Sequence, residues 1–415
     1  MRRTNAIPTR GGKSMRDGWL TAIARLMARI AAALRGTVRF LWPLLIGVLR
    51  AAYAFVVRLV PVARQLGLGL WSRWTNAGRL FRRRAILAVA AIAIVLFAWS
   101  WRHVPGHWLD ASVLGNRPLN NAKSWYYYLS DLDIEQLAKS DADVLVIDYA
   151  KSGGLVPFTK DEIARIKKKP NGEPRLVISY ISIGEAENYR FYWRQDWTGD
   201  DMPGWHVAEN CAWPRNHMVR FWHDGWKDII WRGKKSYIKR IVEAGFDGVY
   251  LDRIDVWSEL LAERPTAREE MMAFVSALAR TGRALKPGFI IIAQNAEDLL
   301  EVRAYRNVID GLGKEDLLFG QSATGKRNSG GLIRKQLGHI RKLQWDFKPV
   351  LAVEYLTTKE AIEETRKELL RYGMVPTFAH RQLDGSDPTE LSARPRQQYG
   401  TPEWITRQCK NKRHW

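Results

Sequence analysis

The sequence predicts an α/β protein, a (β/α)8 TIM barrel preceded by an N-terminal transmembrane helix. Three observations support this fold class. Apolar runs alternate with amphipathic helical patterns from residue 122 onward, there are eight such runs, and a long uncharged stretch precedes them. Strand–helix alternation indicates a parallel sheet, and eight strands indicate closure into a barrel. The chain has 415 residues, of which 46% are apolar, so it can bury one large core and still have additional segments.

The basic charge of the chain is concentrated at its N-terminus. Residues 1–101 contain 17 Lys and Arg residues and one acidic residue, Asp17, whereas the other 314 residues contain 48 Lys and Arg and 42 Asp and Glu. A basic arm can bind nucleic acid. This arm adjoins an apolar stretch, however, so anionic lipid is the simpler partner and we expect no nucleic-acid partner.

The apolar stretch Ala85–Trp101 contains no charged residue. As a helix it would rise about 26 Å, which is enough to cross the hydrocarbon core of a membrane. Three arginines, Arg82–Arg84, precede it, so the positive-inside rule assigns residues 1–84 to the cytoplasm and the large domain to the extracytoplasmic side, periplasmic or extracellular. We expect an uncleaved, single-pass signal-anchor. A buried core helix is the alternative.

Two questions about the N-terminal region stay open. Residues 18–63 combine a basic amphipathic pattern with apolar residues interrupted by Arg and Pro, so this segment either lies on the membrane surface or includes a second span. The true start codon is also open. Residues 102–121 are expected to form a linker to the barrel.

The predicted barrel occupies residues 122–384, followed by an Arg/Gln-rich tail, 385–415, that we expect to be mobile. A long connection between Ser182 and Trp226 exceeds an ordinary loop and is therefore expected to be functional. The predicted strands are 125–129, 144–148, 175–182, 248–252, 289–293, 308–313, 350–355 and 374–379. The predicted helices lie near 133–140, 160–169, 226–245, 267–286, 296–307, 332–344 and 358–372.

Acidic residues follow several of these strands. Active sites of such barrels lie at the C-terminal ends of the strands, and acids that converge there raise some pKa values and form acid/base pairs. Carboxylates close at least five strands, at Asp148, Glu185, Asp252, Glu315 and Glu354. The sequence therefore predicts an acidic cleft at this end of the barrel.

Glycoside hydrolysis needs two carboxyl groups on either side of one bond. Asp252 and Glu315 follow the fourth and sixth strands, which can bring them to either side of a sugar ring. The alternative for each acid is an ion pair with a nearby arginine such as Arg253 or Arg381.

Eleven aromatic residues lie between Tyr189 and Trp231, Trp222 among them. We expect most of these rings to pack the long connection against the barrel, and two or three to contact a sugar ligand.

Other site classes are less well supported. The two cysteines, Cys211 and Cys409, exclude a disulfide scaffold and a multi-cysteine zinc site, and they either pair or remain free thiols. The histidines lack metal-ligand spacing, so we expect no metal and no cofactor. Residues 320–327 nearly match a phosphate-binding loop, but Arg327 occupies the position of the magnesium ligand. We interpret this segment as a flexible loop over the cleft.

Four motifs together resemble glycoside hydrolase family 114, the endo-α-1,4-polygalactosaminidases and related barrels. They are 124–129 (SWYYYL), 146–149 (VIDY), 180–187 (YISIGEAE) and 245–255 (GFDGVYLDRID), and the resemblance covers residues 122–384. It implies a (β/α)8 barrel that hydrolyses a galactosamine-containing polysaccharide, with Asp252 as the nucleophile and Glu315 as the acid/base. By the same resemblance the substrate contacts would include Asp148, Tyr180, Glu185, Asn295 and Glu354. Asp255, Trp222 and Arg381 complete the predicted set of substrate-binding residues.

An acidic cleft suits such a substrate, because deacetylated galactosamine is cationic near neutral pH. We therefore expect a membrane-anchored endo-glycosidase.

One alternative is a tethered module that binds or assembles an exopolysaccharide without cutting it. Another is a barrel enzyme acting on an amide or a small phosphorylated sugar, although no Gly-rich phosphate site follows the last two strands. The exact sugar and linkage, the stereochemical outcome and the oligomeric state stay open.

Overall fold

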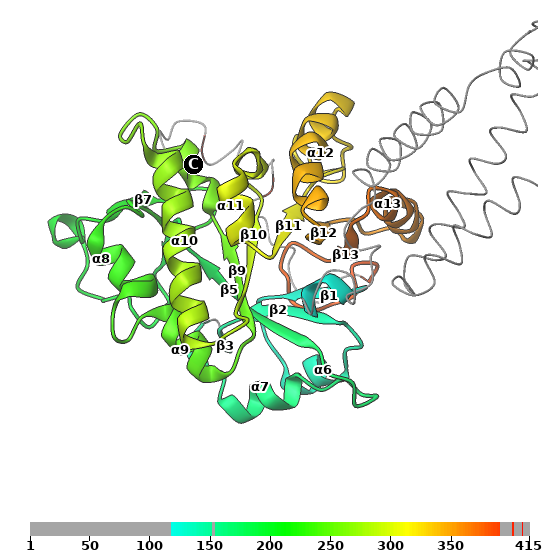
Figure 1. Ribbon diagram of the computed structural model, residues 1–415, viewed down its shortest axis with the longest axis horizontal. Coiled ribbons are helices and arrows are strands. Elements are labelled where there is room, and N and C mark those ends of the chain that lie inside the picture. Colours follow the sequence, from blue (N-terminus) through cyan, green and yellow to red (C-terminus); the bar gives the residue numbers. More distant parts are fainter. Residues whose placement is uncertain (1–117, 152–153, 391–400, 402–408, 410–415) are drawn as a thin grey trace, which may run out of the picture. The chain divides into compact units, whose positions relative to one another are not determined.

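The computed structural model describes residues 118–151, 154–390, 401 and 409 (Figure 1). The predicted transmembrane helix, the basic segment before it and most of the linker lie outside the described residues. Among the described residues, no helix is both long enough and apolar enough to cross a membrane. The chain divides into two units, Met1–Trp101 and Arg102–Trp415, and the second contains the barrel.

Eight parallel strands form one sheet in the order β1-β2-β5-β9-β10-β11-β12-β13. Each predicted strand is confirmed to within a few residues. The strands are β1 (Trp125–Tyr128), β2 (Val144–Asp148), β5 (Leu176–Ser182), β9 (Gly248–Asp252), β10 (Ile290–Gln294), β11 (Gly311–Glu315), β12 (Val350–Glu354) and β13 (Val375–Phe378).

The two ends of this sheet, β1 and β13, meet and nearly close the barrel. No backbone ladder between them is present in the described part of the chain, but the Trp125 indole donates a hydrogen bond of 2.9 Å to the Val375 carbonyl. At the C-terminal end of the barrel, the backbone amides of Leu129 and Ser130 both donate to the Leu383 carbonyl, at 2.7 and 3.1 Å. The predicted TIM-barrel architecture is therefore present in a nearly closed form.

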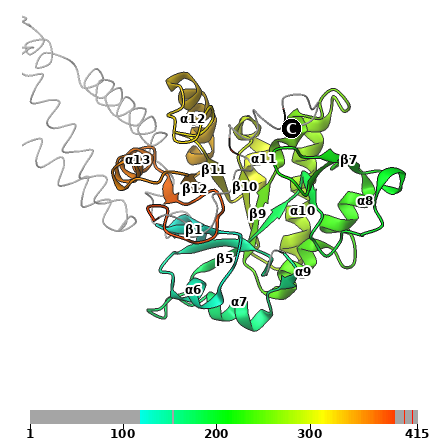
Figure 2. The same cartoon turned by 180° about the vertical axis from the view of Figure 1, so that it is seen from behind.

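Helices surround the strands on their outer side, as the two opposite views show (Figures 1 and 2). Local sequence sets their ends: at the start of α7, for example, Thr159 and Glu162 form a reciprocal capping box. The barrel helices are α6 (Ile134–Lys139), α7 (Lys160–Ile166), α9 (Tyr237–Ala244), α10 (Ala267–Leu285), α11 (Arg303–Val308), α12 (Gly330–Trp345) and α13 (Lys359–Arg371). Short helical turns are η2 (Pro118–Asn121), η3 (Gly199–Asp201), η5 (Ile254–Ser258) and η6 (Glu297–Glu301).

The helix predicted over 226–245 is wrong as a single element. The structure has α8 (Asp224–Lys227), a π-helical turn η4 (Asp228–Arg232) and then α9. The break falls at Gly233, where a Cβ atom would lie 2.5 Å from the Asp228 carbonyl oxygen. The chain turns tightly at this point, and a continuous helix would not permit that turn.

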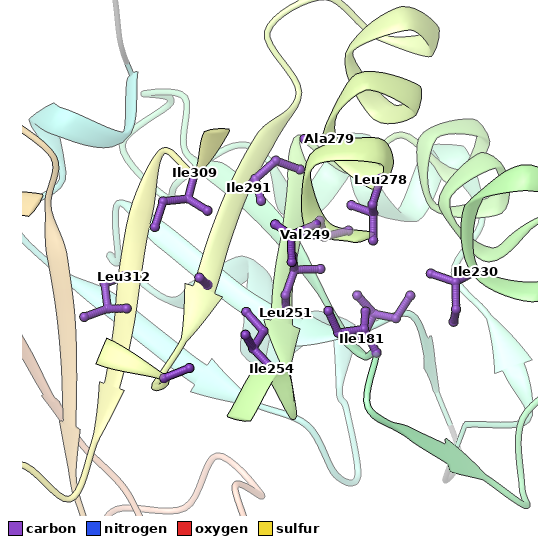
Figure 3. Close-up of a cluster of buried hydrophobic side chains, with 14 of the residues drawn as sticks. Ile181, Ile230, Val249, Leu251, Ile254, Leu278, Ala279, Ile291, Ile309 and Leu312 are labelled. Carbon is purple, nitrogen blue, oxygen red and sulfur yellow. The ribbon is translucent and has the colours of Figure 1, made fainter. Parts of the chain in front are cut away.

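Two cores lie on opposite sides of the sheet, because successive residues of a strand point to opposite faces. The outer core packs strand residues such as Val249, Leu251 and Ile291 against α10 residues Leu278 and Ala279 (Figure 3). The inner core fills the barrel with residues of the opposite alternation. It contains Trp125, Tyr127, Val144, Val146, Ile178, Tyr180, Tyr250, Ile290, Ile292, Leu351, Val353 and Val375.

Tyr250 crosses the barrel interior from β9 to β11. A Cβ atom at Gly313 of β11 would overlap the Tyr250 ring and hydroxyl, so this position requires glycine. One step nearer the N-terminal end, Gly311 leaves space for Leu119 of η2. The residues of β11 that face inward below Glu315 are therefore both glycines, and the space they leave is filled from other elements.

The long connection after β5 folds into a small antiparallel sheet. Its strands are β6 (Glu185–Glu187), β8 (Asn216–Val219) and β7 (His206–Glu209), paired in the order β6-β8-β7. The indole of the fully buried Trp226 donates 2.8 Å to the Ile183 carbonyl, and its ring lies 5.1 Å from that of Trp205. A further hairpin, β3 (Ala150–Lys151) and β4 (Val156–Pro157), follows β2.

A disulfide joins this connection to the C-terminal tail. Cys211 and Cys409 are bonded, with their Cα atoms 5.6 Å apart, and both are buried. The Gly385 carbonyl accepts hydrogen bonds from the Tyr126 hydroxyl at 2.6 Å and from Gln136 at 2.8 Å. The tail, which was expected to be mobile, is therefore joined to the barrel at Gly385 and to the long connection at Cys409.

Candidate active site

A cleft of about 540 Å³ opens at the C-terminal ends of the strands. Strand-end residues form its floor, and the β6–β8 sheet and the segment after β13 form parts of its wall. Six carboxylates line it: Asp148, Glu185, Glu187, Asp252, Asp255 and Glu315. The structure thus brings together eight of the ten predicted site residues, namely Asp148, Tyr180, Glu185, Asp252, Asp255, Asn295, Glu315 and Arg381.

Asp252 is the last residue of β9 and lies beside Ser182 of β5 in the sheet register. Its Oδ2 accepts a hydrogen bond of 2.6 Å from the Tyr180 hydroxyl, and its Oδ1 accepts one of 2.7 Å from the Arg253 backbone amide. Burial, reinforced by the charge of Glu315, raises the pKa of Asp252 to about 7, although the Tyr180 hydrogen bond opposes the shift.

Glu315 ends β11, and three side chains donate to its carboxylate. Tyr355 donates to Oε1 and Gln294 to Oε2, and the Asn295 amide lies 3.5 Å from Oε2. The Asn295 side-chain oxygen Oδ1 accepts from the Glu315 backbone amide at 3.1 Å, which fixes the strand end. Burial, with the neighbouring charge of Asp316, raises the pKa of Glu315.

The Asp252 and Glu315 carboxylates share one electrostatic environment. Two phenols of the barrel interior, Tyr127 and Tyr250, have pKa values raised above all by burial, and the charges of both carboxylates contribute to each shift. The negative charge of Glu315 also raises the pKa of Asp252 directly. Two coupled acids of this kind retain a proton more readily than isolated ones, which gives one protonated and one ionised group at intermediate pH.

Asp148 and Glu187 share one buried arginine as their ion-pair partner. Arg190 donates to Asp148 through two nitrogens, at 2.6 and 2.8 Å, and to Glu187 at 2.6 and 3.0 Å. The Arg190 side chain is only 1% exposed. Asp148 therefore forms part of the cleft wall with its charge already paired.

Glu185 and Asp255 share Arg253. The Arg253 guanidinium lies 2.7 Å from Glu185, 2.6 Å from Glu259 and 3.3 Å from Asp255. Glu185 is buried and also accepts 2.7 Å from Asn210, whereas the Asp255 side chain is 48% exposed. Of these two predicted contacts, Asp255 is the one accessible to a substrate.

Arg381 approaches the cleft from the segment after β13. Its guanidinium binds both oxygens of Asp316, at 2.9 and 2.8 Å, and lies 4.3 Å from the centre of the Tyr355 ring. Tyr355 in turn donates to Glu315. Arg381 therefore supports the hydrogen-bond donor of Glu315 and is itself already paired.

The backbone is strained where the strands end. Non-glycine residues with positive φ follow β9, β10, β11 and β13, at Arg253 (57°), Asn295 (51°), Asp316 (51°) and Leu383 (49°). Such conformations cost roughly 1–3 kcal/mol each and cluster at functional sites. The positive φ of Arg253 orients its backbone amide so that it donates a hydrogen bond to Asp252. Here the strained conformation therefore contributes directly to the site.

Two predicted substrate contacts, Glu354 and Trp222, do not line the cleft. Glu354 is fully buried and accepts hydrogen bonds from the backbone amides of Leu318 and Phe319, at 2.7 and 3.2 Å. Its strand alternation turns it toward the helices, whereas the next residue, Tyr355, faces Glu315. Trp222 packs against the outer core with Arg264 over its ring, at 5.7 Å. Both predictions are corrected on this geometry.

The loop between β11 and α12, residues 320–328, is also not over the cleft as expected. None of its residues lines the cleft. It is closed by a bridge between Phe319 and Arg327, and the Asn328 amide donates to the carbonyls of Asp316 and Leu317 at 2.8 and 3.0 Å.

Sequence reasoning missed Gln294, Tyr355 and Arg190 as site residues. The two-residue period of a strand could have indicated the first two. Gln294 lies two residues after the inward-facing Ile292, and Tyr355 lies two residues after the inward-facing Val353. No comparable signal marked Arg190, since it lies outside the barrel strands. Two of the eleven aromatic residues, Tyr189 and Trp213, line the cleft.

Comparison with known proteins places the chain in a family. The sequence model of glycoside hydrolase family GH114 matches residues 111–393, more than half of the chain. Uncharacterized proteins of Thermotoga maritima and Methanocaldococcus jannaschii are 30% and 34% identical to it over 274 residues. The first alignment covers 63% of this chain and 81% of the relative, and the second covers 64% and 74%.

Similar solved structures include Aspergillus fumigatus Ega3 in complex with galactosamine, which is 17% identical with a TM-score of 0.47. The alignment covers 63% of this chain and 93% of that one. The glycoside hydrolase domain of PelA from Pseudomonas aeruginosa is also 17% identical, with a TM-score of 0.46, covering 63% and 96%. The family match confirms the resemblance read from the sequence motifs. The chain belongs to glycoside hydrolase family GH114 and is a glycosidase.

Proposed function

We propose that the protein is an endo-acting hydrolase of a galactosamine-containing polysaccharide, with Asp252 as the nucleophile and Glu315 as the acid/base. One observation supports this pair above all. Of the six carboxylates that line the cleft, Asp252 and Glu315 are the two that form no ion pair within the described residues. Each accepts a tyrosine hydroxyl hydrogen bond instead, from Tyr180 and Tyr355.

In the proposed reaction Asp252 acts in its ionised form and Glu315 in its protonated form. An Asp252 oxygen attacks the anomeric carbon while the glycosidic C–O bond breaks, and its electron pair leaves with the departing oxygen. That oxygen takes the proton of Glu315. Glu315, now ionised, removes a proton from water, which attacks the anomeric carbon and releases Asp252. Two displacements retain the configuration of the sugar.

The cleft chemistry favours a cationic amino sugar. Besides the reacting pair, Asp255 presents a half-exposed carboxylate, whereas Arg253 and Arg381, two of the cleft arginines, are ion-paired with acids. An ammonium group of a deacetylated galactosamine unit would therefore meet negative potential at the reacting centre.

The assignment is tested with the full-length chain in detergent on a partly deacetylated α-1,4-galactosamine polymer. Asp252→Asn and Glu315→Gln are each expected to lose activity by about 10²–10⁴-fold or more, with circular dichroism spectra unchanged. A substrate with an activated leaving group separates the two roles. Its departure needs no proton, so it should restore the first step, measured as a burst of released leaving group, to Glu315→Gln and not to Asp252→Asn, whereas later turnovers of Glu315→Gln stay slow because water still lacks its base. The opposite pattern would exchange the roles, and normal hydrolysis by Asp252→Asn would refute the pair.

The stereochemical outcome is an independent test. Proton NMR of the first-formed product should give the anomer of the substrate, because a covalent intermediate on Asp252 implies retention. Appearance of the opposite anomer would assign Asp252 as the base of an inverting enzyme.

We further propose that residues 85–101 anchor the chain in a membrane, with the barrel on the extracytoplasmic side. The uncharged stretch and the preceding Arg82–Arg84 favour this orientation, and the Cys211–Cys409 disulfide is typical of an oxidising compartment. A C-terminal alkaline phosphatase fusion should be active and sediment with membranes. Recovery of the intact chain in the soluble fraction would contradict the anchor.

A further inference from the structure

We infer that Trp213 forms an outer sugar-binding subsite of the cleft and that the Cys211–Cys409 disulfide keeps it in position. This inference rests on the proposed function, because it assigns a subsite to the same cleft. Trp213 lies in the turn between β7 and β8, is partly exposed and lines the cleft.

The turn that contains Trp213 is well defined by its own hydrogen bonds. The Asn210 amide donates 2.7 Å to the Asn216 carbonyl, the Trp213 amide donates 3.2 Å to the Asn210 carbonyl, and the Asn216 amide donates 3.1 Å to the Trp213 carbonyl. The indole therefore projects from a closed turn, and its position depends on what holds that turn against the barrel.

Two attachments hold the turn, one on each side. Toward the cleft, the side-chain amides of Asn210 and Asn216 donate to the two oxygens of Glu185, at 2.7 and 3.4 Å. On the other side, Trp213 packs against a buried cluster of Cys211, Ala212 and Cys409. The disulfide thus brings Cys409 of the C-terminal tail into the cluster against which Trp213 packs.

Trp213 packs on the Cys211, Ala212 and Cys409 cluster, but its side chain is partly exposed and lines the cleft. The other aromatic residue of this wall, Tyr189, donates its hydroxyl to Glu187 at 2.5 Å, and the guanidinium groups of Arg190 and Arg215 lie 5.0 and 4.8 Å from its ring centre. Among the described residues, no other ring or guanidinium is stacked on Trp213. An open indole face suits the apolar face of a sugar ring.

The subsite lies away from the reacting sugar. The turn is linked to the nucleophile through other residues. Asn210 of the turn donates to Glu185, Glu185 pairs with Arg253, and the Arg253 backbone amide donates to Asp252. A polysaccharide long enough to pass the catalytic pair would reach Trp213, whereas a short glycoside would not.

The first experiment compares substrates of different length with the full chain. Trp213→Ala is expected to raise KM roughly tenfold for long oligosaccharides, with kcat and KM unchanged for a short aryl glycoside. Trp213→Phe, which keeps an aromatic face, should recover most of the long-substrate affinity. An unchanged KM for long oligosaccharides in Trp213→Ala would overturn the subsite. Absence of hydrolysis in the unmodified chain would instead refute the proposed function.

The second experiment tests the disulfide. The variant Cys211→Ser/Cys409→Ser should reproduce the selective KM increase of Trp213→Ala, and adding Trp213→Ala to it should cause little further change, because both act through the same contact. Dithiothreitol should have the same effect on the wild type and none on the serine variant. Equal losses on short and long substrates would show that the bond supports the whole fold, and would overturn the positioning role.

Discussion

The Tyr180 hydroxyl donates a hydrogen bond of 2.6 Å to Asp252 Oδ2, between the neighbouring strands β5 and β9. A matching bond runs from Tyr355, which directly follows β12, to Glu315 of the neighbouring strand β11, and β10 lies between β9 and β11. Each acid of the proposed catalytic pair therefore has its own phenolic donor. Both bonds stabilise the ionised form of the acid, and so they oppose the effect of burial.

The two tyrosines should control opposite limbs of the pH–activity profile. Loss of the hydroxyl in Tyr180→Phe raises the pKa of Asp252, so the acidic limb of kcat/KM, where the nucleophile ionises, should move to higher pH. Tyr355→Phe raises the pKa of Glu315, so the alkaline limb, where the acid loses its proton, should move to higher pH. Profiles of both variants measure this directly. A shift of the same limb in both would mean that the roles are assigned wrongly or that the pair titrates as one unit.

Asp252 should reduce stability at neutral and alkaline pH. Its pKa in the folded protein is about 7, above the ordinary value of 3.8. The folded state thus retains a proton that the unfolded chain releases near pH 4, so the free energy of unfolding falls as the pH rises from about 4 to about 7. Asp252→Asn removes this penalty, and we expect it to be more stable than the wild type by a few kcal/mol at pH 8.

Urea unfolding at pH 5 and pH 8 tests that expectation. The increase in the free energy of unfolding caused by Asp252→Asn should be clearly smaller at pH 5. As a control, replacing the exposed Asp200 by Asn should change the free energy of unfolding little at either pH. An equal gain at both pH values would show that the effect is not electrostatic.

Gly313 should tolerate no side chain. A Cβ atom at this position overlaps the Tyr250 ring, so Gly313→Ala is expected to destabilise the barrel by about 1–3 kcal/mol or more and to lower activity by displacing the Glu315 strand. Gly338→Ala in α12 is the matched control. No atom lies within 4 Å of its added methyl group, and alanine favours the helix by about 1 kcal/mol. Equal stability of the two variants in thermal unfolding would contradict the role given to Tyr250.

Arg190 should be essential for folding stability. Replacement by Met leaves Asp148 and Glu187 buried without a cation, which typically costs about 3–5 kcal/mol. The control is Arg194→Met, because the Arg194–Asp196 pair is exposed and such pairs contribute little. Denaturant unfolding of both variants at pH 7 makes the comparison, and a small loss in Arg190→Met would indicate that water replaces the guanidinium.

The sequence predicted the strands well because each is a short apolar run between turns. The regular alternation of strands and helices also indicated the order of the strands in the sheet. It also predicted the acids at the strand ends. It failed where the direction of a side chain mattered. Glu354 and Tyr355 are adjacent, and only the inward alternation of Leu351 and Val353 indicates that Tyr355 faces the cleft.

The sequence also did not predict which residues pair when they lie far apart in the chain. Asp148 ends β2 as predicted and Glu185 lies shortly after the end of β5, but the arginines that pair with them, Arg190 and Arg253, are set by loop conformations that no local pattern encodes. The pairing of Cys211 with Cys409 is similar, because 198 residues separate them in the chain. Contacts of this kind become visible only when the fold brings distant segments together.

The strand origin of the catalytic pair has a consequence for heat inactivation. Asp252, Glu315 and Tyr180 all belong to one hydrogen-bonded sheet, and Tyr355 directly follows it, so they should keep their mutual geometry until the sheet itself melts. Trp213 lies on a separate small sheet. On warming, the enzyme should first lose its preference for long chains and only later its ability to cleave short ones.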